Sequence, residues 1–366
     1  LNALLVDEAE KHKYVSFYFN QKCLSVDFEK TTALFKDYDS KAEFIEDADV
    51  IIATDGAGSA LRKSYFTGRK FLFSYSQDYV DLFKIGYAQT FNNNFEGSDA
   101  NTHVTSFDLD FTYPVILNKN NVLVTGLIFI ENDVQLYPST STYESPFTKL
   151  FSTTLKMGLS SKFNDKWSST IVLLPKVASD YKKITKKDFF LGGFAILKLQ
   201  KKPNLIYRFG VYSSAEAFGF FTTPIIGWYY LSPNNKFEMD MSLPISAEIN
   251  YTKGALTYGF DYFGIGRGFN INQDNSNEYV DLSSLEFATY LQYNAFEKSV
   301  LLRAKFGYSS NNYEVYAKGD KYDLGLTAFT FGDNRTQLNP AIMGGLFLKF
   351  EAIYRFNIKS TKKLNS

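Results

Sequence analysis

The chain has 366 residues, of which 39 are basic and 39 are acidic, so its net charge at neutral pH is zero. This balance provides no basic surplus for nucleic-acid binding and no acidic tail. Aromatic residues make up 17% of the chain, with 26 Tyr and 36 Phe, and the mean hydropathy is -0.20. These values exclude a helical membrane protein and favour twisted strands with aromatic girdles.

Cysteine and histidine are scarce. The single cysteine is Cys23, and the two histidines are His12 and His103. One cysteine cannot form a disulfide framework or a thiolate metal site, and so few histidines do not indicate a histidine-based metal site. The cysteine-free stretch from residue 24 onward is typical of a barrel that folds after crossing an oxidising compartment. We therefore expect no metal centre.

The first 79 residues mix helix and strand signals. Residues 1–12 place their leucines on one helical stripe and predict a helix. Residues 24–28 and 32–35 predict a β-hairpin. Residues 49–54 form a short, continuous apolar run, which is typical of a strand buried on both faces of an α/β sheet. The segment Asp55-Gly56-Ala57-Gly58-Ser59 follows this strand, and we expect a helix to begin there.

This glycine-containing turn carries the candidate binding residues. Gly56 and Gly58 let the backbone approach a phosphate and adopt positive φ. Ser59 can cap the following helix, whose N-terminus would face an anion. Arg62 supplies a cation or a salt bridge to Asp55. Taken alone, the motif is more typical of an ordinary strand-to-helix turn with a capping serine than of a cofactor site.

Four segments of this region resemble kynurenine 3-monooxygenase, a class A FAD-dependent hydroxylase. They are residues 1–11, 15–35, 47–65 and 73–79, and the most specific is DADVIIATDGAGSALRKSY at residues 47–65. The resemblance implies hydroxylation of an aromatic amino acid with FAD and NADPH as the activity of a complete enzyme. It also implies FAD binding by the residues of the turn: Asp55, Gly56, Gly58, Ser59 and Arg62.

Parts of that enzyme are expected to be missing from this chain. The G-x-G-x-x-G strand that opens the dinucleotide-binding sheet would precede Leu1. The substrate domain would follow Tyr79, but from about that position the residue pattern changes to an alternation of apolar and polar residues. We therefore predict that residues 1–79 are an incomplete α/β fragment with a vestigial FAD motif, no catalytic residues and no bound cofactor. The alternative is a partial FAD- and NADPH-dependent aromatic hydroxylase.

From about residue 80 onward, apolar and polar residues alternate at period two. Phe107, Leu109 and Phe111 alternate with Asp108 and Asp110, and residues 346–358 repeat the pattern. Such alternation gives each strand one wet face and one apolar face. Turn-forming clusters separate the segments at residues 118–121, 201–204, 232–235, 272–277 and 309–312. We predict that residues 80–366 form an antiparallel transmembrane-type β-barrel of about 12 strands.

A soluble β-sandwich is the alternative fold, because its strands also alternate. The strands expected here are longer than the roughly 5–6 residues of soluble proteins. Tyr and Phe recur near strand ends, as an interfacial belt requires. The last strand is amphipathic and ends in Tyr354 and Phe356. These features favour the membrane barrel.

The same region resembles an uncharacterised outer-membrane barrel family of Gram-negative bacteria, known only as a domain of unknown function. Residues 84–99, 107–116 and 350–359 carry the resemblance. It implies a lipid bilayer as partner and the outer membrane as location, and it leaves cargo and oligomeric state open. We expect a chimeric chain, joined near residues 79–81, with a cytoplasmic-type first part and no signal peptide within it.

Further signals concern the barrel region. Asp108, Asp110, Glu238 and Asp240 are expected to face a lumen, as solvated wall or as determinants of solute selectivity. Residues 264–269 (GIGRGF) resemble a nucleotide-binding loop but lack a following helix, so we interpret them as strand-end glycines at a barrel rim. The lysines of residues 182–187 predict a solvated turn. The predicted function is structural or passive transport of small solutes; an adhesion role for a loop at residues 131–146 is a further alternative.

Overall fold

The computed structural model describes residues 19–27, 32–47, 79–140, 145–273, 277–310 and 312–357. The chain divides into two compact units, the second of which runs from Leu72 to Lys359. Each unit is described by itself. Among the described residues, no helix has the length and apolar character needed to cross a membrane.

The first unit contains a three-stranded antiparallel sheet. Its strands are β1 (Gln21–Asp27), β2 (Thr32–Asp37) and β3 (Glu43–Asp47), in that order. The pairing of β1 with β2 confirms the hairpin predicted for residues 24–28 and 32–35. The described part is entirely β, so the predicted α/β fragment is not observed there; the helix expected at residues 1–12 and the strand at 49–54 lie outside the described residues.

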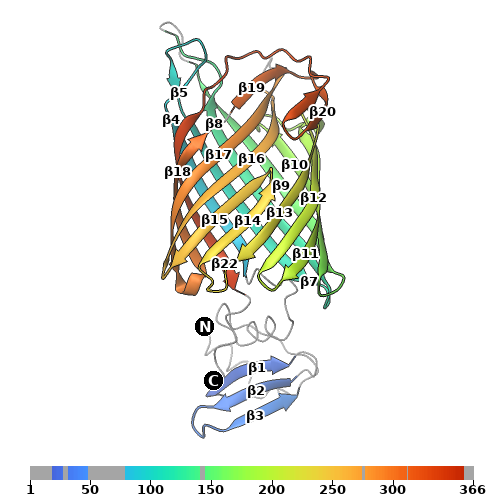
Figure 1. Cartoon of the computed structure of the whole chain (residues 1–366), viewed down its shortest axis with the longest axis vertical. Coiled ribbons are helices and arrows are strands. Elements are labelled where there is room, and N and C mark those ends of the chain that lie inside the picture. Colours follow the sequence, from blue (N-terminus) through green and yellow to red (C-terminus); the bar gives the residue numbers. More distant parts are fainter. Residues whose placement is uncertain are drawn as a thin grey trace, which may run out of the picture. The chain divides into compact units, whose positions relative to one another are not determined.

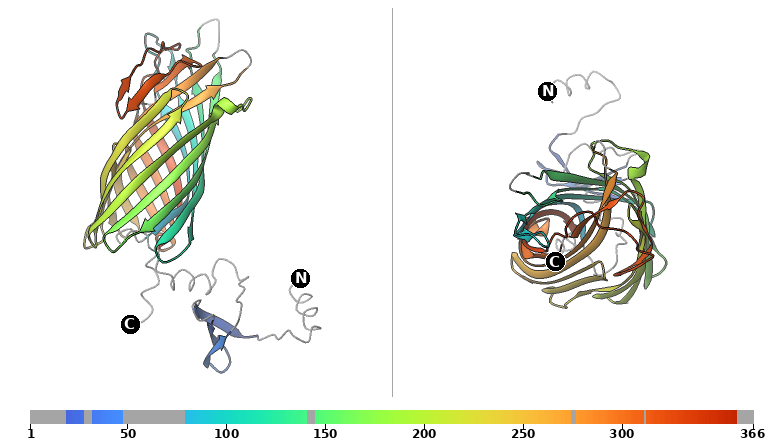
Figure 2. Two further views of the ribbon diagram at one scale, coloured as in Figure 1. Left: turned by 90° about the vertical axis from the view of Figure 1, so that its right-hand side faces the viewer. Right: turned by 90° about the horizontal axis from the view of Figure 1, so that it is seen from above.

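The second unit is a closed antiparallel barrel. Its wall is formed by fourteen of the described strands, and Figure 2 shows the ring along its axis. Strand β22 pairs with β4 and closes the ring. The wall strands are β4 (Tyr79–Phe91), β7 (Val104–Ile116), β8 (Asn121–Gln135), β9 (Phe147–Lys162), β10 (Trp167–Ser179), β11 (Phe189–Lys202), β12 (Leu205–Glu216), β13 (Gly219–Leu231), β14 (Phe237–Leu243), β15 (Ser246–Lys253), β16 (Leu256–Ile271), β17 (Glu278–Ala295), β18 (Val300–Ser309) and β22 (Gly345–Asn357).

The predicted number of about 12 strands was therefore too low. Strands β14 and β15 have only 7 and 8 residues. Such short strands carry too few alternations to stand out between their longer neighbours. An even strand number agrees with the general architecture of bacterial outer-membrane barrels.

The two faces of the wall differ as the alternation predicted. On β18, Leu302 and Phe306 are about half exposed, whereas Leu301, Arg303 and Lys305 are buried. A closed ring can bury only its inner face, so exposed apolar side chains lie outside and charged ones inside. This arrangement rules out the two stacked sheets of a sandwich.

The two ends of the barrel differ in their connections (Figure 1). At the turn end, short turns such as residues 117–120 and 163–166 join the strands. At the loop end, longer connections carry β5 (Asn93–Asn94), β6 (Asn101–Thr102), the 3₁₀ turn η2 (Lys186–Asp188), β19 (Asn312–Ala317), β20 (Tyr322–Leu326) and β21 (Phe329–Phe331). A second 3₁₀ turn, η3 (Phe296–Lys298), lies between β17 and β18. Outer-membrane barrels place short turns on the periplasmic side and long loops outside.

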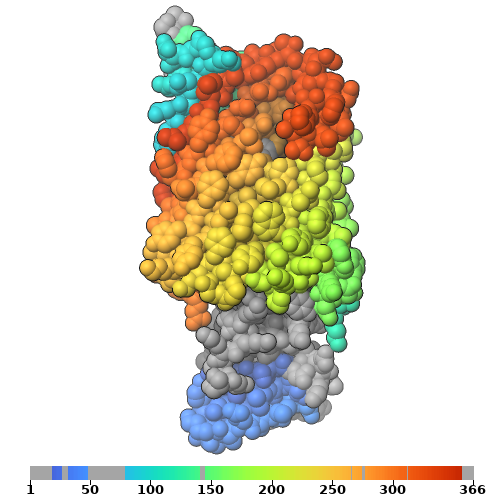
Figure 3. All heavy atoms as spheres, in the orientation of Figure 1, coloured from blue at the N-terminus to red at the C-terminus, as the bar shows by residue number. Residues whose placement is uncertain are grey.

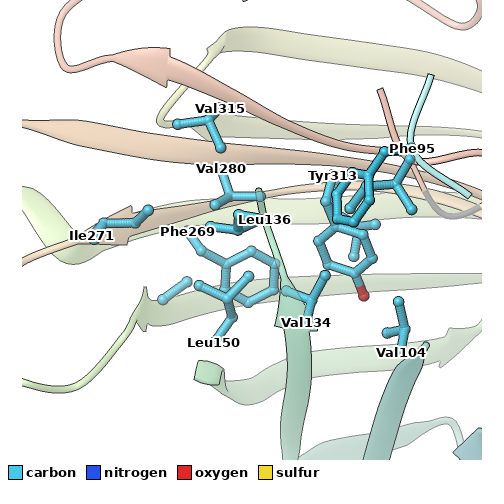
Figure 4. Packing of buried hydrophobic residues seen from close by; sticks show 13 residues of the cluster. Phe95, Val104, Val134, Leu136, Leu150, Phe269, Ile271, Val280, Tyr313 and Val315 are labelled. Atoms are coloured by element: carbon cyan, nitrogen blue, oxygen red, sulfur yellow. The ribbon is translucent and has the colours of Figure 1, made fainter. Parts of the chain in front are cut away.

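An apolar cluster fills part of the loop end (Figure 4). The inner faces of β7, β8 and β9 pack against those of β16, β17 and β19. Strand β16 reaches this position because its end crosses to β10, with which it pairs in parallel at Ser179 and Asn270. The cluster members are Phe95, Val104, Val134, Leu136, Leu150, Ala178, Phe269, Ile271, Val280, Leu282, Tyr313, Val315 and Ile342. This packing closes that part of the barrel to water.

Candidate functional site

The lumen of the barrel contains two adjoining cavities. The turn-end cavity has a volume of about 380 Å³, and the central cavity about 640 Å³. Lys84, Asp240, Glu248 and Arg303 line both cavities. The two cavities therefore adjoin along these four residues, and together they give the barrel a polar interior from the turn end to the middle.

The acidic residues expected in the lumen do lie there. Asp108, Asp110 and Asp240 line the central cavity, and Glu238 lines the turn-end cavity. The period-two pattern predicted their direction, because residues of equal parity on a strand share one face. It did not predict their partners.

Glu351 on β22 is the centre of an ion-pair cluster in the middle of the lumen. Its side chain is 0% exposed and lies 3.0 Å from Lys84 Nζ, 3.2 Å from Lys305 Nζ and 3.5 Å from Lys349 Nζ. Lys349 also pairs with Asp108 at 2.6 Å. Removing one member of such a buried network leaves charges uncompensated, at a typical cost of about 3–5 kcal/mol.

Arg303 on β18 extends this cluster toward the turn end. Its Nη2 lies 3.0 Å from Glu248 Oε1, and its Nε donates to Gln292 Oε1 at 2.8 Å. The guanidinium stacks over Tyr290, 4.0 Å from the ring centroid. Arg303 faces Glu351 across the β18–β22 pair. The planar guanidinium can satisfy several such partners at once, which a lysine cannot.

The lumen wall is balanced in charge. Among the residues that line the two cavities, nine are basic and nine are acidic. Further pairs join Arg208 to Asp240 and Lys305 to Asp261, and Arg355 lies 2.5 Å from Asp81 near the turn end. A wall of one sign would concentrate ions of the other sign. A balanced wall lacks that effect.

A third cavity, the side cavity, has a volume of about 620 Å³ and lies in the wall near the loop end. Tyr262 and Ser284 line both the side cavity and the central cavity. No pattern in the sequence indicated it, because it forms between strands that are distant along the chain.

The vestigial FAD motif cannot be placed. Asp55, Gly56, Gly58, Ser59 and Arg62 lie outside the described residues, so their predicted role stays a prediction. Residues 264–269 lie inside β16. They therefore form part of a strand, as the interpretation as strand glycines rather than a nucleotide-binding loop predicted.

The closed antiparallel ring, with its apolar exterior and charged interior, defines an outer-membrane-type channel barrel, whose exterior fits a lipid bilayer. Within this class, the chain belongs to the family Domain of unknown function (DUF6268), whose profile matches residues 84–320.

Solved structures with a similar fold are outer-membrane proteins. A channel from Pseudomonas putida F1 is 10% identical, with a TM-score of 0.36 over 75% of this chain and 94% of that one. The toluene transporter TodX of Pseudomonas putida is 9% identical, with a TM-score of 0.33 over 80% of this chain and 91% of that one. These likenesses concern the fold alone.

Curated relatives confirm the resemblance to kynurenine 3-monooxygenase. The enzyme of Caenorhabditis briggsae is 34% identical over 96 residues, which are 22% of this chain and 20% of that protein. The enzyme of Phaeosphaeria nodorum is 38% identical over 86 residues, which are 22% of this chain and 17% of that protein. The chain thus spans about a fifth of the length of these two relatives.

Proposed function

We propose that the barrel is a passive channel of the outer membrane for small solutes without net charge. The observation that carries this proposal is the polar interior of two adjoining cavities with equal numbers of basic and acidic side chains. Cavities of some hundreds of Å³ match small molecules rather than folded chains.

In this channel the solute passes the ion-pair cluster around Glu351, which lines the central cavity. Its charges contact one another across strands β4, β18 and β22, so they offer little net field to a passing solute. A neutral solute with hydroxyl or amide groups can exchange hydrogen bonds with this wall without disturbing the charge balance. A free ion would have to compete with existing ion pairs.

The direct test measures permeation in liposomes that contain the purified chain. We expect swelling in arabinose above the rate of protein-free liposomes, and a reversal potential close to zero in a potassium chloride gradient across a planar bilayer. Swelling equal to that of protein-free liposomes would refute the channel.

A matched pair of variants tests the role of the lumen wall. Glu351→Gln removes the acidic centre of the cluster, so we expect selectivity to shift toward anions. Phe350→Leu alters the neighbouring residue, which is 61% exposed on the outer face, and should leave selectivity unchanged. Equal selectivity in both variants would show that the solute does not pass Glu351.

We also propose that residues 1–79 are a non-functional remnant of an FAD-binding domain, and that the full chain binds no flavin. The short coverage of the curated relatives supports this proposal. The absorption spectrum of the purified full chain tests it, because stoichiometric flavin absorbance would overturn it. Such a result would favour the alternative, a partial aromatic hydroxylase.

A further inference from the structure

The barrel wall has a gap above the hairpin of β14 and β15 (Figure 1). Strand β13 pairs with β14 only from Ile226 to Leu231, and β16 pairs with β15 only from Leu256 to Phe263. The seven residues of β13 before Ile226 therefore lack β14 as a neighbour. At a rise of about 3.3 Å per residue, the gap extends for about 20 Å along the strand.

The cover hairpin, formed by β20 and β21, partly fills this gap. Strand β20 pairs in parallel with the free edge of β13, and Thr327 N donates to Thr222 O at 3.1 Å. In the described part of the chain, β20 pairs with β13 and β21 but with neither β16 nor β17. The cover hairpin is therefore attached to the wall through its backbone on one side only. Its other side forms a seam with β16 and β17.

Arg335 holds this seam through its side chain. Its Nη1 lies 2.9 Å from Asp281 Oδ2 and 3.1 Å from the Tyr279 hydroxyl, both on β17. Its Nε lies 2.9 Å from Asp333 Oδ1, beyond β21. The guanidinium also stacks over Tyr316 and Tyr322, at 4.1 and 5.0 Å from their centroids. One side chain thus connects the cover hairpin with the wall.

The side cavity lies behind this seam. Six aromatic side chains from five strands and one turn line it: Tyr212, Phe218, Phe221, Tyr262, Tyr316 and Tyr322. On β16, a Cβ added at Gly266 would find its nearest neighbour, a Phe218 ring atom, only at 3.8 Å. The absence of a side chain at this position therefore keeps the cavity open.

The charged groups of the side cavity already have partners. Asp281 and Asp333 pair with Arg335, and Glu314 accepts a hydrogen bond from the Tyr316 hydroxyl at 2.8 Å. Hydroxyl groups of Ser283, Thr223 and Thr327 add neutral polar sites to the aromatic wall. A bound ion would have to displace one of these pairs, whereas a neutral ring with a hydroxyl group would not.

The rim of the gap is apolar on its outside. Ile226, Leu243 and Leu285 are 59%, 41% and 44% exposed there. Figure 3 shows a hollow beside the red segment that contains the cover hairpin. Since the side cavity also shares Tyr262 and Ser284 with the central cavity, it lies between the outer surface and the lumen.

From these contacts we infer that the side cavity binds neutral aromatic molecules carrying a hydroxyl or similar polar group, and that it leads them between the seam and the lumen. This inference names the solute class of the proposed channel and rests on that function for the onward path. The binding step itself does not depend on conduction. The solute could be supplied by the bilayer or by water, because the chemistry of the cavity is the same for both.

Equilibrium binding of 1-naphthol to the full chain in lipid nanodiscs tests the site, with empty nanodiscs as the reference. We expect saturable binding, at least tenfold weaker binding of the anion 1-naphthalenesulfonate, and at least tenfold weaker binding of 1-naphthol to Gly266→Phe, which fills the cavity. Gly266→Ala is the matched control and should bind within twofold of the wild type. Equal binding by Gly266→Phe and the wild type would overturn the inference.

Thiol labelling identifies the side from which the cavity is reached. In a chain with Cys23→Ser, the variant Ser283→Cys places one thiol in the cavity wall. We expect 1-naphthol to protect this thiol from a maleimide dissolved in the bilayer, from a charged water-soluble thiosulfonate, or from both. Preference for the first reagent shows access from the bilayer, and preference for the second shows access from water. Labelling by neither reagent would overturn the access route.

The two proposals fail in different ways. Loss of swelling with intact binding of 1-naphthol would refute the channel and retain the binding site. Swelling in arabinose without saturable binding of 1-naphthol would retain the channel and refute the site.

Discussion

Replacing Arg335 with Gln should open the seam between the cover hairpin and the wall. The substitution removes the ion pairs with Asp281 and Asp333 and the hydrogen bond to Tyr279. Burial alone would lower the pKa of Arg335, but its hydrogen bonds to Asp333, Tyr279 and Asp281 outweigh this and raise the pKa well above its ordinary value. The arginine is therefore charged at any working pH, and the substitution removes a full charge.

The magnitude follows from the burial of the pair. The side chains of Arg335 and Asp281 are only 5% and 12% exposed. Removing one partner of a buried pair costs about 3–5 kcal/mol, and the lower value applies because the side chain of Asp281 is not fully buried. About 3 kcal/mol corresponds to roughly a hundredfold increase in the population of the open seam.

The assay is the labelling rate of Ser283→Cys, measured with and without Arg335→Gln in the Cys23→Ser chain. Where the opening of the seam limits labelling, we expect the labelling rate of the thiol to rise by about two orders of magnitude in Arg335→Gln. Asp333→Asn is the matched control: it removes the partner whose side chain is 28% exposed, and it should cost about 1 kcal/mol or less. A labelling rate in Arg335→Gln that stays at the level of this control would refute the role of Arg335 in holding the seam closed.

Three further predictions concern the loop end and the path to the lumen. Asn339→Ala removes two hydrogen bonds that Asn339 Nδ2 donates, to Leu136 O and Tyr313 O, and one that its Oδ1 accepts from Val315 N. We expect the free energy of unfolding, measured by urea titration, to fall by about 2–4 kcal/mol. Asn334→Ala, at an exposed position, is the control and should leave it unchanged. Burial raises the pKa of Asp188, but hydrogen bonds from Thr185, Asn272 and Asn270 outweigh it and lower the pKa below its ordinary value. The contribution of Asp188 to stability is therefore present above the unfolded-state pKa and is lost as pH falls through the folded-state pKa. The amide protection factors of residues 180–188, which compare measured with intrinsic exchange rates, should fall over this acidic range in the wild type but not in Asp188→Asn. Tyr262→Ala removes a ring between the side and central cavities and should increase passage of 1-naphthol into liposomes; an unchanged rate would place the path elsewhere.

The sequence predicted the wall of the barrel better than its ends. On β22 the side chains that alternate at period two, such as Lys349 and Glu351, face the lumen as expected. This succeeded because the direction of a side chain on a strand depends on local geometry alone. The pairing of Arg303 with Glu351 depends on the register between strands, which single-sequence alternation leaves open.

The side cavity could not be predicted for a related reason. It arises because β14 and β15 are short and because the end of β16 crosses to Ser179 on β10. These are contacts between segments far apart in the chain, and they produce no local periodicity. The glycines of residues 264–269 were interpreted as strand-end residues, and they do lie in the last part of β16; the room that Gly266 leaves for a cavity was not predicted.

The half of β16 nearer the loop end links the apolar cluster there with the side cavity. One face carries Phe269 and Ile271, which pack into the apolar cluster of the loop end. The other face carries glycines, and at Gly268 a Cβ would lie 2.9 Å from Ala217 N, closer than backbone atoms permit. Glycine there lets the turn between β12 and β13 pack directly on β16, and Gly268 N donates to the buried Glu216 carboxylate at 3.1 Å. The same inward position of β16 therefore buries apolar side chains on one face and, further along at Gly266, leaves room for a ligand on the other.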